Sequence, residues 1–155
     1  MFKVYFEDIE VGDTAEFGSY EVTKDEIIEF ASKYDPQPFH LSDDFAKHTP
    51  LGGLCASGWH TSAMMMSMIV AQMKAVGLAS LGSPGVDNLK WLAPVRPGDI
   101  LGVKQTIDEK IPSKSRPDLG IVRIHHYVYT RQGTLVLDMI STVMVACRPK
   151  EAEDE

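Results

Sequence analysis

Hydrophobic residues follow different spacings along the chain, and each spacing predicts a different element. Alternating polar and apolar positions over residues 14–22 predict a β-strand. The next apolar residues recur with a helical period, and Thr23 precedes Glu26 by the three positions of a capping box. Pro36 disfavours helical geometry at the residue before it, so we expect a short helix that begins after Thr23 and ends near Tyr34.

The longest apolar segment of the chain follows residues 54–61. Its side chains are apolar on nearly every side of a helix, which predicts a long helix buried on most sides. Gln72 and Lys74 interrupt the segment, which is also short for a membrane span. Methionine adapts to irregular surfaces, so we interpret the methionine run as core packing. The apolar positions are Met64, Met65, Met66, Met68, Ile69, Val70, Met73 and Val76.

The last part of the chain is rich in β-branched and aromatic residues, which are typical of strands. It follows a glycine-rich connection over residues 77–85. Sequential strands joined by short turns imply an antiparallel sheet, and a long helix followed by such strands implies a sheet curled around that helix. The sequence therefore predicts an α+β fold. The expected strands are residues 86–95, 100–111, 121–130 and 134–147, the last two joined by a hairpin turn at residues 131–133.

Length and charge limit the kind of protein that this chain can be. A single domain is expected over residues 1–149, with an acidic tail over residues 150–155. The net charge of −7 and the scattered basic residues argue against nucleic acid or an anionic membrane as partner. The N-terminus lacks the pattern of a signal peptide, so we expect a cytoplasmic protein in which Cys55 and Cys147 are reduced core thiols.

One loop carries two titratable groups in a stiff frame. Asp35 and His40 are five residues apart, and Pro36 and Pro38 lie between them. Each proline fixes its own φ and keeps the residue before it out of the helical region, so we expect an extended loop. A carboxylate beside an imidazole can orient a water, remove one proton and deliver another. The same pair is equally compatible with a structural ion pair at a helix end.

A second candidate lies at the start of the long helix, at Ser57 and Gly58. Free backbone N–H groups at a buried helix N-terminus attract a developing oxyanion, and glycine permits close approach of a ligand carbonyl. Gly58 is also compatible with an ordinary helix start. Signatures of other chemistry are absent, because the sequence has no dinucleotide or phosphate-binding glycine loop, no zinc spacing and no nucleophile elbow around Ser57. We therefore expect no metal site and no covalent nucleophile.

These residues resemble a known family. Residues 35–40, Asp-Pro-Gln-Pro-Phe-His, are similar to the hydratase motif D-x-N-P-[hydrophobic]-H of MaoC-like dehydratases and (R)-specific enoyl-CoA hydratases. Ser57-Gly58 occupies the place of the family's helix-start glycine, and residues 91–99 resemble its strand–turn segment. The resemblance extends over most of the chain and implies the hotdog fold, in which a curled antiparallel sheet wraps a long central helix.

The resemblance also implies an activity and a set of roles. The family hydrates 2-enoyl thioesters to (R)-3-hydroxyacyl thioesters or catalyses the reverse dehydration. By position, Asp35 and His40 would be the catalytic pair that activates water, and the Gly58 amide would bind the thioester oxygen. Ser57 and Gln37 would complete the oxyanion and substrate site. The implied substrate is an acyl thioester of coenzyme A or acyl carrier protein, with no metal or other cofactor, and the implied assembly is a homodimer or a higher homo-oligomer.

Two positions depart from the family pattern, and two other functions stay open. Gln37 stands where the family has Asn, and Ser57 stands where it commonly has His, which puts substrate identity in question more than reaction type. A hotdog thioesterase would need a carboxylate aimed at the thioester from another position. A non-catalytic acyl-CoA-binding protein would have no need of Asp35 and His40.

Overall fold

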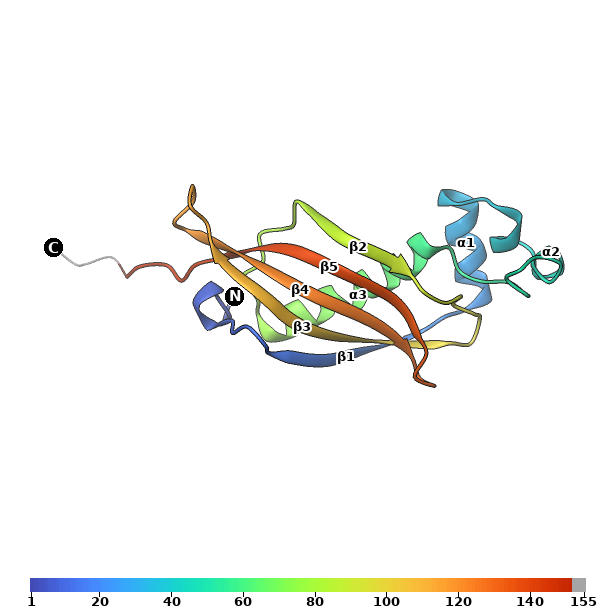
Figure 1. The fold of residues 1–155 in the computed structure, drawn as a ribbon, viewed down its shortest axis with the longest axis horizontal. Helices are drawn as coiled ribbons and strands as arrows, with labels where there is room; N and C mark the ends of the chain where they lie inside the picture. Colours follow the sequence, from blue (N-terminus) through green and yellow to red (C-terminus); the bar gives the residue numbers. More distant parts are fainter. Residues whose placement is uncertain (152–155) are drawn as a thin grey trace.

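The structure, a computed structural model, describes residues 1–151 and shows a five-stranded antiparallel sheet curled around one long helix (Figure 1). The order of the strands in the sheet is β1-β3-β4-β5-β2. The predicted α+β arrangement is therefore confirmed. The strands are β1 (Thr14–Glu21), β2 (Gly85–Trp91), β3 (Ile100–Pro112), β4 (Leu119–Thr130) and β5 (Leu135–Ala146), and the helices are α1 (Lys24–Tyr34), α2 (Asp43–Ala46) and α3 (Gly58–Val76), with single 3-10 turns at Phe6–Asp8 and Pro38–His40.

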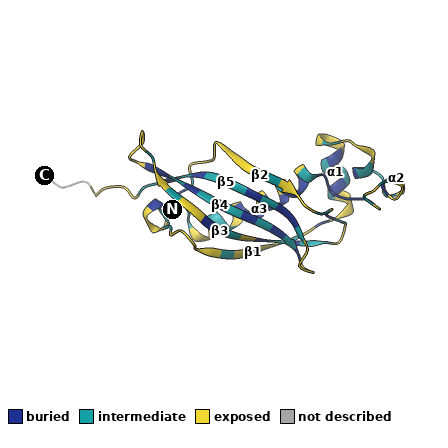
Figure 2. Ribbon diagram, viewed as in Figure 1, coloured by how far each residue is buried: buried dark blue, intermediate teal, exposed yellow. Residues whose placement is uncertain are grey.

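The core lies between the sheet and one side of α3. Along β4 the side chains alternate between buried and half-buried, as expected for a strand with one face on a core (Figure 2). Met64, Met65 and Met68 of α3 pack against this inner face, which confirms that methionines fill the core. Apolar burial of this kind supplies most of the free energy that holds the helix in the sheet.

The other side of α3 is not buried, so the prediction of a helix covered on most sides is wrong. Met66 is 45% exposed and Val70 is 37% exposed. Apolar composition shows that a helix face avoids water, but it does not show whether the same chain covers that face. Trp59, about two turns before Met66 on this side, is also exposed, at 58%.

Helices α1 and α2 lie together beyond one end of the sheet, close to the N-terminus of α3 (Figure 1). The Thr23 hydroxyl accepts a hydrogen bond from the Glu26 N–H at 3.2 Å, so the predicted cap of α1 is confirmed. The second hydrogen bond of a capping box, from the Thr23 N–H to the Glu26 carboxylate, is not formed, so that part of the prediction is wrong. The Glu26 carboxylate instead accepts hydrogen bonds from Tyr20 of β1 and His60 of α3, and so ties α1 to both elements.

Strand β2 ends at Trp91, four residues earlier than predicted. The chain then leaves the sheet edge, and the Val95 carbonyl accepts a hydrogen bond from the Ala56 N–H at 2.9 Å. Pro94 has no N–H to offer a ladder, which favours this departure. The segment that follows β2 is thereby attached to the residues that precede α3.

Both cysteines are free thiols, and Cys55 is buried as predicted, whereas Cys147 is only half-buried.

Most of the predicted acidic tail, residues 152–155, lies outside the described residues. Within residues 1–151, no helix combines the length and apolar composition needed to cross a bilayer.

Candidate active site

Asp35 and His40 meet across the loop that follows α1. Asp35 is the C-cap of α1, and its N–H donates to the Ala31 carbonyl at 2.9 Å. Its Oδ2 lies 3.4 Å from Nε2 of His40, which is buried. The prediction of a fully extended loop is wrong for Pro38–His40, which forms one 3-10 turn. Pro38 begins this turn because its fixed φ suits the first helical position and its missing N–H is not needed there.

The ring of His40 has a defined proton position. Its Nδ1 lies 2.7 Å from the backbone carbonyl of Cys55, and a carbonyl oxygen only accepts hydrogen bonds. Nδ1 therefore carries the proton, and in the neutral imidazole Nε2 has the lone pair. Because Nε2 faces the Asp35 carboxylate, two acceptors converge on the same small volume.

Two neutral donors hold the Asp35 carboxylate. The Ser57 hydroxyl donates to Oδ2 at 2.7 Å, and the Gln37 side-chain amide donates to Oδ1 at 2.7 Å. Burial raises the pKa of Asp35, but the hydrogen bonds from Ser57 and Gln37, together with nearby His40, outweigh burial and lower it. Asp35 is therefore an ionised acceptor at neutral pH. The residues predicted as substrate ligands, Ser57 and Gln37, are placed by the structure against this carboxylate.

The N-terminus of α3 leaves its first amides available. Ser57 is the N-cap residue of α3, yet its hydroxyl does not cap the helix because it is turned toward Asp35. Among residues 1–151, none of the backbone hydrogen bonds outside the regular ladders uses the Gly58 N–H. A helix N-terminus without a cap presents free N–H groups and a positive dipole end, which suit an anionic oxygen.

Gly58 is required by a close packing contact. A Cβ atom at this position would lie only 2.2 Å from the ring of Trp91. The Trp91 indole N–H donates to the Ser62 hydroxyl at 3.1 Å, and Ser62 in turn donates to the Gly58 carbonyl at 3.1 Å. Trp91 therefore fixes the first turn of α3 to the end of β2.

A second polar cluster, which sequence reasoning missed, lies between α1 and α3. The Glu26 carboxylate accepts from Tyr20 and lies 3.0 Å from Nε2 of His60, which is buried and stacks on Phe30. The hydrogen bond to Glu26, with burial, raises the pKa of Tyr20 to about 12. These residues border a cavity of about 470 Å³ that also includes Tyr34, the neighbour of Asp35. Nothing in their spacing along the chain signals this contact.

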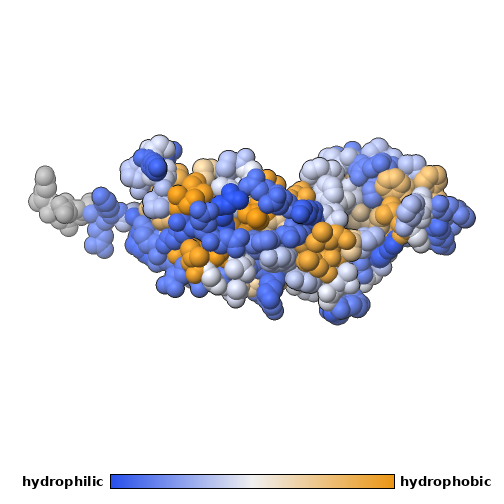
Figure 3. All heavy atoms as spheres, in the orientation of Figure 1, coloured by the Kyte–Doolittle hydropathy of each residue, from blue (hydrophilic) through white to orange (hydrophobic). Residues whose placement is uncertain are grey.

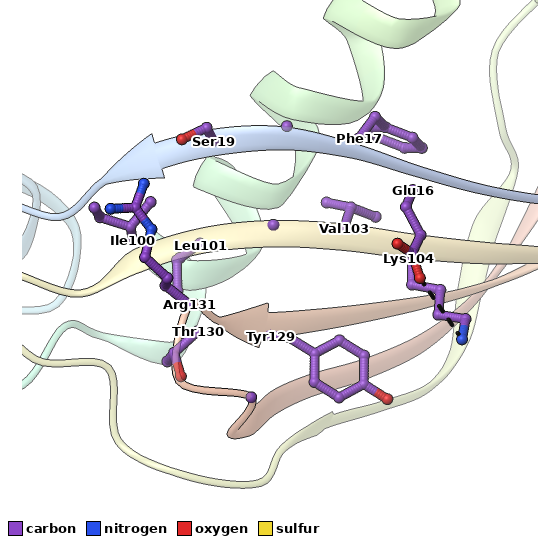
Figure 4. A pocket seen from close by; sticks show the side chains of 13 residues that line it. Glu16, Phe17, Ser19, Ile100, Leu101, Val103, Lys104, Tyr129, Thr130 and Arg131 are labelled. Carbon is purple, nitrogen blue, oxygen red and sulfur yellow. Dashed lines mark ion pairs between the residues drawn. The ribbon is translucent and has the colours of Figure 1, made fainter.

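The structure also has a groove of about 650 Å³ across β1, β3 and the β4–β5 hairpin (Figure 4). Lys104 and Glu16 form an ion pair there at 3.8 Å, and Tyr129 and Arg131 also line the groove. Neither Asp35 nor His40 lines this groove. The sheet face in Figure 3 is mostly hydrophilic with separate apolar patches. In the described part of the chain, no group of three or more His, Cys, Asp or Glu side chains is arranged to hold a metal ion.

Comparison with known proteins identifies the family. Residues 8–128 match the family described as MaoC like domain. The chain belongs to the MaoC-like dehydratase family. It is 35% identical to the 3-hydroxybutyryl-CoA dehydratase of Methylorubrum extorquens over 118 residues, which are 76% of this chain and 72% of that protein. It is 26% identical to the (R)-specific enoyl-CoA hydratase of Rhodospirillum rubrum over 145 residues, which are 93% of each chain.

The crystal structure of a MaoC-like dehydratase from Rhodospirillum rubrum is also similar, with a TM-score of 0.86 and 38% identity over 96% of this chain and 100% of that one. The resemblance and the hotdog fold inferred from the sequence are therefore confirmed. The named relatives of this MaoC-like protein are a hydratase and a dehydratase, which are carbon–oxygen lyases. Its two departures from the family motif, Gln37 and Ser57, are the two donors to Asp35.

Replacing Ser57 should change the pH at which the protein unfolds in acid. The folded pKa of Asp35 lies below its ordinary 3.8, so its ionised form stabilises the fold above that value, and this contribution disappears as pH falls through the lowered pKa. Ser57→Ala removes one donor, so the pKa of Asp35 should rise. We expect the midpoint of acid unfolding, followed by circular dichroism, to move to higher pH. Ser67→Ala, on the exposed side of α3, should leave that midpoint unchanged.

Proposed function

We propose that this protein adds water to a 2-enoyl thioester, or removes it from the 3-hydroxyacyl thioester, with Asp35 and His40 as the catalytic pair. The observation that carries this proposal is the 2.7 Å hydrogen bond from Ser57 to Asp35. It joins the loop of Asp35 and His40 to the residue immediately before Gly58. The pair that activates water and the amide that binds the thioester oxygen therefore lie next to each other. The names of the relatives support a coenzyme A thioester as substrate, with an acyl carrier protein thioester as the alternative carrier.

The first step is activation of a water molecule. In the neutral tautomer set by Cys55, His40 offers the Nε2 lone pair, and ionised Asp35 offers a carboxylate oxygen 3.4 Å away. A water that donates one hydrogen bond to each is oriented with its oxygen lone pairs toward the substrate. As the oxygen attacks C3 of the enoyl group, His40 takes the proton, and the Asp35 charge stabilises the imidazolium that forms.

The second step completes the addition at C2. The electron pair of the C2–C3 double bond moves toward the thioester carbonyl and produces an enolate-like oxygen. The Gly58 amide at the N-terminus of α3 stabilises that charge, because a preformed donor costs no reorganisation during the reaction. His40 then returns its proton to C2. Water is the only co-reactant, so the reaction needs no redox cofactor.

We further propose that the protein works as a homodimer. Trp59, Met66 and Val70 recur at positions that share one face of α3, and that face is exposed in the single chain. Trp91 and Leu92, at the end of the edge strand β2, are exposed beside it, and Trp91 contacts Trp59 with ring centroids 4.9 Å apart. A second copy on this surface would cover these side chains. Light scattering should give twice the chain mass, and a monomer at working concentration would contradict the dimer.

Incubation with an enoyl-CoA tests the function directly. Hydration should remove the absorbance of the conjugated enoyl thioester without releasing free thiol, and chiral analysis should give the (R)-3-hydroxyacyl product. Release of thiol would indicate a thioesterase instead. Binding of acyl-CoA without turnover of short, branched or dicarboxylic enoyl and 3-hydroxyacyl thioesters would indicate a binding protein.

A further inference from the structure

We propose, resting on the function proposed above, that Arg96 is a positioning residue that fixes the proton of His40 through the loop before α3. Arg96 lies outside the catalytic pair and in the turn between β2 and β3. Its side chain reaches back to the loop at residues 51–54, which precedes Cys55. Cys55 supplies the carbonyl that accepts from His40.

The guanidinium of Arg96 donates its hydrogen bonds to backbone carbonyls. Nη1 donates to the Gly53 carbonyl at 2.7 Å and lies 3.4 Å from the Leu54 carbonyl, and Nη2 donates to the Leu51 carbonyl. Three acceptors within four residues require several donors in a fixed plane. A guanidinium provides them, whereas the single ammonium of a lysine cannot span them in the same geometry.

The loop needs such a clamp because its own sequence does little to fix it. Gly52 has a φ of +72°, and Gly53 follows it, so two consecutive residues have no side chain to pack. Its other hydrogen bonds all come from backbone N–H groups: Leu51 to the Thr49 hydroxyl at 3.3 Å, Gly52 to the Thr49 carbonyl at 3.0 Å, Leu54 to an Asp43 carboxylate oxygen at 2.9 Å and Ala56 to the Val95 carbonyl. Without Arg96, three carbonyls at the centre of the loop lose their donors.

The turn that carries Arg96 is itself anchored. The Arg96 N–H donates to the Asp99 carboxylate at 2.8 Å. Two backbone bonds tie the turn to Val22, one from the Gly98 N–H at 2.7 Å and one to the Asp99 carbonyl at 2.8 Å. Val22 immediately precedes Thr23, the cap of α1. The turn of Arg96 thus holds the start of α1, the helix that ends at Asp35. The Arg96 side chain holds the segment that orients His40.

The consequence for catalysis concerns the tautomer of His40. With the Cys55 carbonyl in place, Nδ1 carries the proton and Nε2 can accept one from water. If the loop moves, Nδ1 loses its acceptor, and the tautomer with a proton on Nε2 can instead donate directly to Asp35. In that state the imidazole is no longer a base for water. Arg96 thus favours the reactive tautomer without contacting the substrate.

The test compares Arg96→Gln with Arg131→Gln, a matched change at an exposed arginine of the β4–β5 hairpin. We expect kcat of Arg96→Gln to fall about 10- to 100-fold, as for other changes that misplace a catalytic group. The KM should change less than about threefold, because no ground-state contact is removed. Guanidinium added to Arg96→Gln should restore part of kcat. Arg131→Gln should keep wild-type activity, and added guanidinium should not change it.

Nitrogen NMR of the His40 ring provides a readout that does not depend on turnover. The wild-type protein should show Nδ1 protonated, and Arg96→Gln should show protonation shifted toward Nε2. An unchanged tautomer and unchanged kcat in folded Arg96→Gln would overturn the proposal, as would a loss confined to KM. If the tautomer shifts in Arg96→Gln while the wild-type protein hydrates no enoyl thioester, the positioning role stands and the proposed function fails.

Discussion

His40→Gln should lower kcat for enoyl-thioester hydration at least about 100-fold, the low end for a positioned acid–base group. Gln fills a similar volume and can still donate to the Cys55 carbonyl, but it has no nitrogen that accepts a proton from water. Asp35→Asn should cost a similar factor for a different reason. An amide offers one acceptor oxygen to the two donors Ser57 and Gln37, and it cannot stabilise an imidazolium.

The pair should also behave as a unit. If Asp35 orients water and stabilises the charge that His40 acquires, each group contributes to the rate only when the other is present. We therefore expect the double variant His40→Gln/Asp35→Asn to be scarcely slower than either single variant. Steady-state kinetics of the three proteins, with circular dichroism to show that each is folded, makes the comparison. Near-wild-type turnover by either folded single variant would show that the pair is only a structural contact.

The sequence predicted the parts of the fold that depend on local spacing. Alternation, a capping residue and prolines were enough to place the strands, α1 and the position of Asp35 just after that helix. The order of a long helix followed by a meander predicted the curled sheet. The exposed side of α3 was not predictable in this way, since Met66 and Val70 are as apolar as the core residues and only their neighbours differ.

The sequence was enough to propose the residues of the candidate site, but it did not predict their contacts. Asp35, His40 and Gly58 were identified by residue type, whereas the hydrogen bond from Ser57 spans 22 positions and depends on how α1 meets α3. Arg96 has no sequence signature as a clamp, because its acceptors are backbone carbonyls. The structure also accounts for the two motif departures together, since Gln37 and Ser57 bind opposite oxygens of one carboxylate.

Gly58→Ala should damage both stability and activity, because the added methyl group has no space. Its Cβ would lie 2.2 to 2.6 Å from three ring atoms of Trp91, closer than any real contact. Either Trp91 or the first turn of α3 must move, and such overpacking typically costs about 1–3 kcal/mol. Movement of the turn would carry the Gly58 amide away from the position proposed for the thioester oxygen. We expect kcat to fall by about 100-fold, comparable to the loss of one oxyanion donor.

A second substitution separates the two effects. In Gly58→Ala/Trp91→Ala the methyl group has room, so the free energy of unfolding should fall by less than the sum of the two single changes. Denaturant titration of the four proteins measures this coupling. Because alanine keeps the backbone N–H, the double variant should also regain kcat to the level of Trp91→Ala if the amide is the oxyanion donor. Stability that recovers while kcat stays low would contradict that role and would leave Gly58 as a packing residue required by Trp91.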